Sequence, residues 1–183
     1  MTSSIDKTKP YFPLAGGAND GWSNDDEATA TCFCGAVQLS LPLNAPGLIT
    51  SFICNCADCH KITASMSTTG LVVRDTHLTH IRGRENLSTY SQSKTIFMKP
   101  TDPDGKPKDN TVTNHFCKTC GSLMYRVGAS FPGISVLRLG TVDDFSLHEG
   151  KLRPRVEIFE KDRVGWRGGV EGVQGFWNDG LHP

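Results

Sequence analysis

The chain has 183 residues, which is long enough for one domain with a sizeable hydrophobic core. Its 19 lysines and arginines balance its 19 aspartates and glutamates, so no overall positive field exists to attract nucleic acid or an anionic membrane surface. The polar N-terminus lacks the apolar segment of a secretory signal, and no apolar stretch is long enough to span a bilayer. These features predict a soluble, cytoplasmic protein with neither nucleic acid nor membrane as a partner.

The N-terminal segment, residues 1–30, is rich in glycine, proline, asparagine and aspartate and has no sustained periodicity. This composition predicts an irregular arm over residues 1–30. Tyr11, Phe12 and Trp22 are expected to anchor parts of the arm to the core, because isolated aromatic residues in a polar segment more often pack than bind a ligand.

The alternation of apolar and polar side chains over residues 37–41 is typical of a half-buried strand. Other short segments with β-like composition follow: Leu48–Ile53, Gly70–Arg74, His77–Ile81, Leu87–Ser91, Thr95–Met98, Thr111–Phe116, Leu123–Val127, Ile134–Leu139 and Val156–Phe159. No long apolar stripe at helical spacing separates them, and the 19 glycines and 10 prolines lie mainly where turns are needed. The sequence therefore predicts a mostly β protein with one domain over residues 31–165.

Two further segments interrupt this pattern. Residues 99–110 combine prolines with charges and are predicted to form an exposed loop between strands. The tail, residues 166–183, is rich in glycine but carries Trp166, Phe176 and Trp177, so we expect it to pack on the domain.

Cysteine provides the strongest chemical signal. All seven cysteines fall into three tight clusters: Cys32 and Cys34; Cys54, Cys56 and Cys59; and Cys117 and Cys120. Buried structural cysteines would be scattered through the strands, and a redox CxxC motif would follow a strand in a βαβ unit. Neither pattern fits, whereas pairs of cysteines at tight turns are typical zinc ligands in an intracellular protein. The sequence therefore predicts bound zinc.

Seven ligands divide most naturally into four and three. Cys34 and Cys120 are each followed by glycine, which lets the backbone fold closely around a thiolate. On this basis we group Cys32, Cys34, Cys117 and Cys120 as a closed structural site. Spacing alone also allows a zinc ribbon made of Cys56, Cys59, Cys117 and Cys120, with Cys32, Cys34 and Cys54 left over.

With the preferred division, Cys54, Cys56 and Cys59 hold a second zinc ion and leave its fourth position open, which is the mark of a catalytic site. Three thiolates weaken zinc as a Lewis acid but suit the handling of a soft thiol, so the predicted chemistry makes or breaks a carbon–sulfur bond. His60 could serve as a base or an extra ligand, although adjacent side chains usually point apart. The remaining histidines lack ligand spacing and receive no role: His77, His80, His115, His148 and His182.

The clusters and their neighbours resemble the glutathione-dependent formaldehyde-activating enzyme (GFA) family, whose domain also occurs in centromere protein V. The similarity covers most of the chain and rests on the motifs Cys32-x-Cys34-Gly35-Ala36-Val37, Cys54-x-Cys56-x-x-Cys59-His60-Lys61, His115-Phe116-Cys117-x-x-Cys120-Gly121-Ser122 and Gly140-Thr141-Val142-Asp143-Asp144. The C-terminal Arg153–Phe159 segment with Trp166 is similar to fungal members. The Asp143-Asp144 pair itself is expected to form a turn or cap.

This resemblance implies a zinc-bound, β-tent-like single domain with few short helices, a structural zinc on four cysteines and a catalytic zinc on three. It also implies glutathione as cosubstrate and an S-(hydroxymethyl)glutathione synthase type of carbon–sulfur lyase. The partners would be a small-molecule thiol and an aldehyde or a glutathione conjugate. The sequence departs from many members at His115 and Ala64 and in the loop of residues 99–110, which bears on substrate choice. A non-catalytic zinc module that binds a partner, and a thiol-redox or zinc-buffering protein, are the alternatives.

Overall fold

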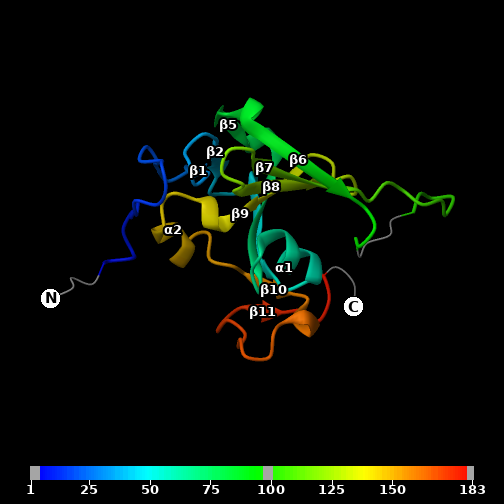
Figure 1. Cartoon of the computed structure of the whole chain (residues 1–183). Helices are drawn as coiled ribbons and strands as arrows, with labels where there is room; N and C mark the ends of the chain where they lie inside the picture. Colours follow the sequence, from blue (N-terminus) through cyan, green and yellow to red (C-terminus); the bar gives the residue numbers. More distant parts are fainter. Residues whose placement is uncertain (1–4, 97–100, 181–183) are drawn as a thin grey trace.

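The computed structural model describes residues 5–96 and 101–180, and in them the chain forms a single, mostly β domain (Figure 1). Two short α-helices are present in this part, α1 (Ala57–Thr63) and α2 (Ser146–Glu149), with 3₁₀ turns at Asp75–His77, Arg84–Asn86, Leu139–Thr141 and Glu160–Asp162. None of these helices is long and apolar enough to cross a membrane. The predicted fold class is therefore confirmed.

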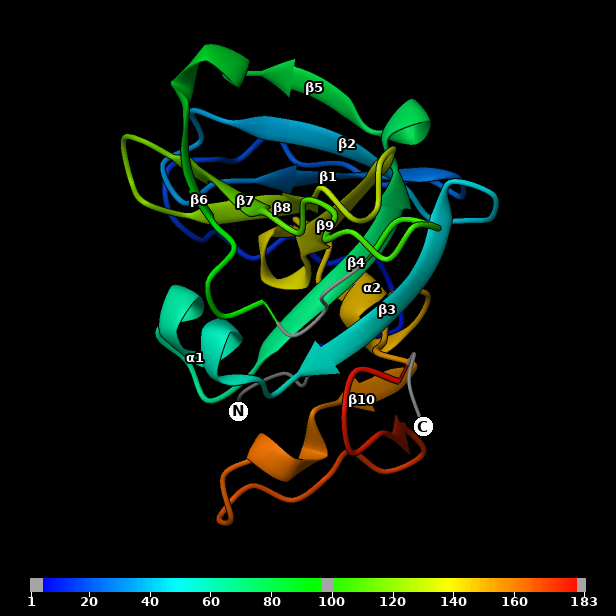
Figure 2. The ribbon, with the colours of Figure 1, turned by 90° about the vertical axis from the view of Figure 1, so that its right-hand side faces the viewer.

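The strands form two sheets (Figure 2). The smaller sheet has the order β1-β2-β5 and is antiparallel: β1 (Glu27–Thr31), β2 (Gln38–Pro42) and β5 (Thr79–Arg82). The larger sheet has the order β11-β10-β3-β4-β9-β8-β7-β6: β3 (Leu48–Cys54), β4 (Thr68–Arg74), β6 (Leu87–Gln92), β7 (Val112–Cys117), β8 (Leu123–Gly128), β9 (Ile134–Arg138), β10 (Val156–Ile158) and β11 (Gln174–Gly175). Strands β3 to β9 pair antiparallel, whereas β10 pairs parallel with both β3 and β11.

The main core combines side chains from both sheets. Its fully buried members include Leu39 and Leu41 of β2, Leu71 of β4 and Leu137 of β9. A smaller second cluster forms around Phe52 with Cys54 and Cys59 and packs against β10. Since Cys32 and Cys117 belong to the main core, the two sets of cysteines are built into different parts of the hydrophobic interior.

Strand β2 differs from the predicted half-buried strand. All five of its residues are buried, including Gln38 and Ser40. Gln38 Nε2 donates to Thr31 Oγ1 at 3.0 Å and to Asp20 Oδ1 of the N-terminal arm at 3.3 Å, whereas Ser40 Oγ is buried without a hydrogen-bond partner. The alternation of apolar and polar residues is the same whether the polar side chains face water or are buried, so it could not predict that both faces of β2 are buried.

The N-terminal arm is shorter than predicted, because β1 already begins at Glu27. Tyr11 is anchored as expected: its ring contacts Phe145 edge-on at 6.3 Å, and its backbone N–H donates to Asp144 Oδ1 at 3.0 Å. Phe12 and Trp22, by contrast, remain 43% and 37% exposed. Tyr11 is thus the aromatic anchor of the arm.

Three other segments can be compared with their predictions. Residues 101–110 are mostly exposed, as expected for the loop, while 99 and 100 lie outside the described residues. The predicted strand over Thr95–Met98 is wrong for its first two residues, which lie after the end of β6; the other two are not described. The tail adds β11 at the edge of the large sheet, but Trp166 and Trp177 are 77% and 69% exposed, so these two side chains do not pack across the core.

Candidate metal centres

The first candidate centre, the four-cysteine group, joins two hairpins. Cys32 and Cys34 lie in the β1–β2 turn, Cys117 is the last residue of β7, and Cys120 lies in the β7–β8 turn. All four Sγ atoms lie within 4.8 Å of one another, with Cys34 Sγ 3.6 Å from Cys32 Sγ and 3.7 Å from Cys117 Sγ. A tetrahedral zinc ion with Zn–S bonds of about 2.3 Å would separate its sulfur ligands by roughly 3.8 Å. The donor set therefore fits one such ion.

Glycine makes these two turns possible. Gly35 and Gly121 have φ values of 81° and 76°, in the left-handed region that side chains disfavour. The N–H groups of Gly35 and Gly121 donate to the carbonyls of Cys32 at 2.9 Å and Cys117 at 2.8 Å, which closes each turn. The glycines thus have the conformational role that the sequence indicated.

Polar groups around the four-cysteine group donate hydrogen bonds to sulfur. The Val37 N–H donates to Cys32 Sγ at 3.2 Å, and Asn86 Nδ2 donates to Cys117 Sγ at 3.2 Å. Burial raises the pKa of Cys32 to about 12, whereas for Cys120 burial is outweighed by hydrogen bonds with the Ser122 side chain and backbone, and the pKa falls to about 6. Donors aimed at sulfur are the surroundings expected of thiolate ligands.

The second candidate centre, the three-cysteine group, lies where β3 enters α1. Cys54 is the last residue of β3, Cys56 is the N-cap of α1, and Cys59 is buried in the first turn of this helix. Their Sγ atoms also lie within 4.8 Å of one another, and the Cys59 N–H donates to Cys56 Sγ at 3.4 Å. A strand end followed by an N-cap lets three closely spaced residues present their sulfurs to one point.

The thiols of this group influence one another strongly. Hydrogen bonds with Cys54 and Cys56 lower the pKa of Cys59 to about 3, and the positive charges of Arg126 and Arg138 favour its thiolate further. Hydrogen bonds with the two other cysteines, together with burial, raise the pKa of Cys54. The group fits a soft divalent cation, which would replace the shared protons and relieve the crowding of three sulfurs.

A buried polar network holds the loop between these ligands. Asn55 is completely buried; its Nδ2 donates to Glu157 Oε1 at 2.9 Å, and its backbone N–H donates to the Ile158 carbonyl at 3.1 Å. Arg167 Nη1 donates to Asn55 Oδ1 at 2.9 Å and lies 3.2 Å from Glu157 Oε1, while Arg163 Nη1 lies 3.2 Å from Glu157 Oε2. We call Asn55, Glu157, Arg163 and Arg167 the bracing network, because it connects the loop of the three-cysteine group to the C-terminal segment.

The structure also answers the open questions about grouping. Cys56 and Cys59 lie in a different group from Cys117 and Cys120, so the geometry does not correspond to a zinc ribbon. His60 is not a member of either cysteine group, and its Nε2 atom is buried without a hydrogen-bond partner. Lys61 is exposed on α1.

The aspartate pair and the histidine before the last cluster have structural contacts. Asp143 accepts a hydrogen bond from Thr31 Oγ1 at 2.6 Å, and Asp144 accepts bonds from the Tyr11 N–H and the Ser146 side chain. These contacts agree with the predicted turn or cap. His115 stacks on Tyr125 with the ring centroids 4.4 Å apart.

Sequence reasoning missed the arginines near the three-cysteine group and the bracing network. Arg126, Arg138, Glu157 and Arg167 lie far from the cluster in the sequence, and only the pairing of β10 with β3 brings Glu157 to Asn55. Asn55 itself, an amide residue between two ligands, was the one local signal that could have drawn attention to a buried polar contact.

The fold and the two candidate centres define the class of protein: it is mostly β and has two separate cysteine groups, each of which could hold a metal ion. The family model described as glutathione-dependent formaldehyde-activating enzyme (GFA) matches residues 27–162, and the chain belongs to this family. No curated protein matches the chain. A crystal structure of a protein from Rhodobacter sphaeroides aligns with 23% identity and a TM-score of 0.42, covering 62% of this chain and 85% of that one.

Proposed function

We propose that this protein is a zinc-dependent carbon–sulfur lyase that acts on glutathione adducts, of the S-(hydroxymethyl)glutathione synthase type. In this proposal it condenses glutathione with formaldehyde or with another aldehyde in the cytoplasm. Membership of the GFA family supports the reaction class. The observation that carries the proposal is the separate group of three buried or half-buried cysteines, whose sulfurs converge without a fourth cysteine.

The two groups take different roles in this proposal, with one zinc ion in each. Cys32, Cys34, Cys117 and Cys120 hold a structural zinc, because four sulfurs complete a tetrahedron. Cys54, Cys56 and Cys59 hold a catalytic zinc, which supplies an open position where a thiol loses its proton readily.

The surrounding residues prepare the three-cysteine group for this role. The N-cap position of Cys56 directs its sulfur toward the first turn of α1, and Phe52 with the apolar residues of β10 keeps water away from the buried side of the group. The bracing network fixes the loop from the opposite side. In the reaction, the thiol sulfur forms a bond to the aldehyde carbon, the carbon–oxygen double bond becomes single, and the oxygen takes up the proton lost by the thiol.

The test measures the condensation directly. Nuclear magnetic resonance exchange spectroscopy gives the rate at which glutathione and formaldehyde form S-hydroxymethylglutathione, above the rate without protein. We expect the zinc-loaded protein to accelerate this exchange and Cys54→Ser to abolish the acceleration, to lose one of two zinc ions and to keep its fold. Ile49→Val, an exposed position on the same strand, is the matched control. Acceleration by Cys54→Ser equal to that of the unmodified protein would refute the proposed role of the group.

A further inference from the structure

A charged side chain that forms no ion pair with any described residue lies inside the protein, on the face of the sheet that carries Cys54. Arg138, the last residue of β9, is 5% exposed. Its Nε and Nη2 atoms are buried and have no hydrogen-bond partner, and its Nη1 atom reaches only Thr68 Oγ1 at 3.5 Å. Burying a guanidinium group in this way is costly unless a nearby anion compensates its charge.

Strand register places Arg138 on the same face of the sheet as the three-cysteine group. Arg138 pairs with Gly70, and Gly70 pairs with Phe52; directly paired residues share a face of the sheet. Cys54 lies two residues beyond Phe52 and therefore projects to the same side. Gly70 lets the Phe52 ring pack closely against the sheet between these residues, because a Cβ atom at Gly70 would lie only 2.6 Å from that ring.

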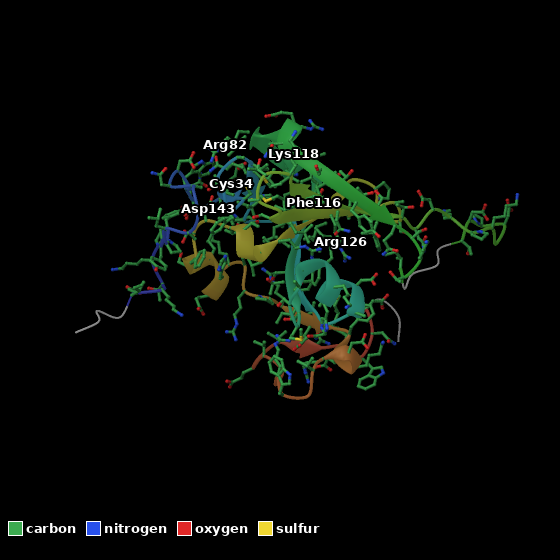
Figure 3. The ribbon with its side chains drawn as sticks, viewed as in Figure 1. Cys34, Arg82, Phe116, Lys118, Arg126 and Asp143 are labelled. Atoms are coloured by element: carbon green, nitrogen blue, oxygen red, sulfur yellow. The ribbon has the colours of Figure 1, made fainter. Side chains whose placement is uncertain are left out.

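A second arginine lies on this face. Arg126 of β8 pairs with Val136, which lies two residues before Arg138 on β9. Its side chain is half-buried and forms no hydrogen bond or ion pair among the described residues, and Figure 3 shows it apart from Cys34. We call Arg126 and Arg138 the arginine pair.

The arginine pair and the three sulfurs interact electrostatically. The Arg138 side chain extends along this face toward the sulfurs: its Nη1 atom lies 3.5 Å from Thr68 Oγ1, and Thr68 pairs directly with Cys54. A positive charge there attracts thiolates in the low-dielectric interior. The nearest acidic side chain on α1, Asp58, accepts hydrogen bonds from Thr95 Oγ1 at 2.7 Å and Gln92 Nε2 at 3.3 Å and forms no ion pair with either arginine.

The net charge of the metal-loaded three-cysteine group and the arginine pair determines which ligands the centre attracts. Three thiolates that hold a divalent ion leave one negative charge, whereas the arginine pair carries two positive charges. The centre therefore keeps a surplus positive charge, and Arg126 is its solvent-accessible end. The four-cysteine group differs, because Arg82, the arginine beside it, is neutralised by bidentate contact with Asp20.

We propose that the arginine pair makes the three-cysteine group a receptor for anionic thiols, with Arg126 contacting the carboxylate of the ligand and Arg138 acting as a buried countercharge for the metal-loaded sulfurs. Arg138 is a positioning residue in this scheme, since its free donors are sealed from solvent. The inference deepens the proposed function and rests on it for the presence of a divalent ion.

The first experiment uses two thiols of the same length, 3-mercaptopropionate and 3-mercapto-1-propanol, titrated calorimetrically into the zinc-loaded protein. We expect the anionic thiol to bind about tenfold more tightly, and Arg126→Gln to abolish this preference while Arg126→Lys keeps most of it. Arg74→Gln, an exposed arginine at the far end of β4, is the matched control and should leave the preference unchanged. Equal affinities for the two thiols in the unmodified protein would overturn the inference.

The second experiment isolates Arg138 by chelator competition for zinc, without any assay of activity. Arg138→Gln should weaken zinc binding to the three-cysteine group by about 10- to 100-fold and leave the four-cysteine group unchanged. Arg138→Lys retains the charge and should stay within about threefold of the unmodified protein, so a larger loss in this variant contradicts the countercharge role even if the Gln variant does not fold.

The two proposals can fail separately. A preference for 3-mercaptopropionate that disappears in Arg126→Gln, combined with no binding of glutathione, supports the arginine pair and refutes glutathione as the cosubstrate. Accelerated glutathione–formaldehyde exchange without any preference between the two small thiols supports the proposed function and refutes the arginine pair.

Discussion

The two cysteine groups bring their sulfur atoms together by different structural means. In the four-cysteine group, backbone turns with left-handed glycines supply the geometry, and two hairpins contribute two ligands each. In the three-cysteine group, a strand end and a helix N-cap supply all ligands within residues 54–59, and distant side chains supply the support. Each half of the first group is shaped by its own turn, and the two halves come from distant parts of the sequence. The ligands of the second group are close in sequence, but its supporting side chains come from residues 157–167.

This difference suggests that the four-cysteine group stabilises the domain and that the three-cysteine group carries the chemistry. The four-cysteine group connects the early and late strands and belongs to the main core, so an ion there would stabilise the whole domain. The three-cysteine group lies in the smaller cluster and faces a pair of arginines. The predictions below test how far the two groups can be separated, beginning with the largest effect.

The largest effect is expected from Cys117→Ser, which removes a fully buried ligand of the four-cysteine group. Structural zinc contributes apparent binding free energies on the order of 10 kcal/mol, comparable with the whole stability of a typical domain. We therefore expect this variant to unfold, with loss of its circular dichroism spectrum, while Cys54→Ser stays folded. Equal folding of the two variants would remove the distinction between the groups.

Glu157→Gln tests the support of the three-cysteine group. The carboxylate is 2% exposed and forms ion pairs with Arg163 and Arg167, of which Arg163 also contacts Glu160. Neutralising Glu157 removes both ion pairs and should cost roughly 2–3 kcal/mol in the free energy of unfolding. Zinc affinity should fall about tenfold or more at the three-cysteine group only, measured by chelator competition. Glu171→Gln, an exposed position on the same C-terminal segment, is the control; a loss of zinc from the four-cysteine group instead would contradict the assignment of the network.

Asp144→Asn affects neither group and tests the anchor of the arm. Burial opposes ionisation of Asp144, but hydrogen bonds from Ser23, Tyr11 and Ser146 outweigh it and hold the pKa of this carboxyl below its ordinary value of 3.8. A lowered pKa stabilises the fold fully above that ordinary value, and the contribution is lost as the pH falls through the lower, folded-state pKa.

At neutral pH we expect Asp144→Asn to lose about 1–2 kcal/mol in the free energy of unfolding and to expose the arm to limited proteolysis. The difference from the unmodified protein should shrink as the pH falls below the ordinary value of 3.8. Both zinc ions should remain bound at neutral pH; release of either ion there would show that the arm supports a metal group.

The smallest effect is expected from Gly121→Ala. Its φ of 76° disfavours a side chain, but a new Cβ atom would meet nothing within 4 Å, so only backbone strain of about 1 kcal/mol is added. Thermal unfolding should shift by a few degrees, with zinc content unchanged. Gly83→Ala is the matched contrast, because a Cβ there lies 2.0 Å from the Ala36 carbonyl oxygen and should destabilise far more.

Local sequence signals predicted a large share of this molecule. Alternation and turn residues located most strands to within a few residues, because both are properties of short segments. The Cys-x-Cys-Gly and Cys-x-x-Cys-Gly patterns pointed to turns whose glycines do adopt positive φ values. Burial of both faces of β2 was missed, because the partners of Gln38 include Asp20 in the irregular arm.

Long-range contacts account for the remaining differences. Glu157 and Arg167 join Asn55 only after β10 has paired parallel with β3, and nothing near Asn55 in the sequence specifies that pairing. Similarly, nothing in the sequence distinguishes Arg126 and Arg138 from other charged residues in strands. Only the strand register places them on the same face of the sheet as Cys54. Metal ligands can be recognised from their spacing in the sequence, but residues that support a site from other strands show no such characteristic spacing.

The parallel pairing of β10 with β3 also has a consequence for synthesis on the ribosome. The ligands Cys54, Cys56 and Cys59 leave the exit tunnel about 100 residues ahead of Glu157 and Arg167, which at about 5–20 residues per second is a delay of roughly 5–20 s. During this interval the three thiols are present without their bracing network. We therefore expect the nascent chain to acquire the reactive centre late, after the strands that carry the rest of the domain have been made.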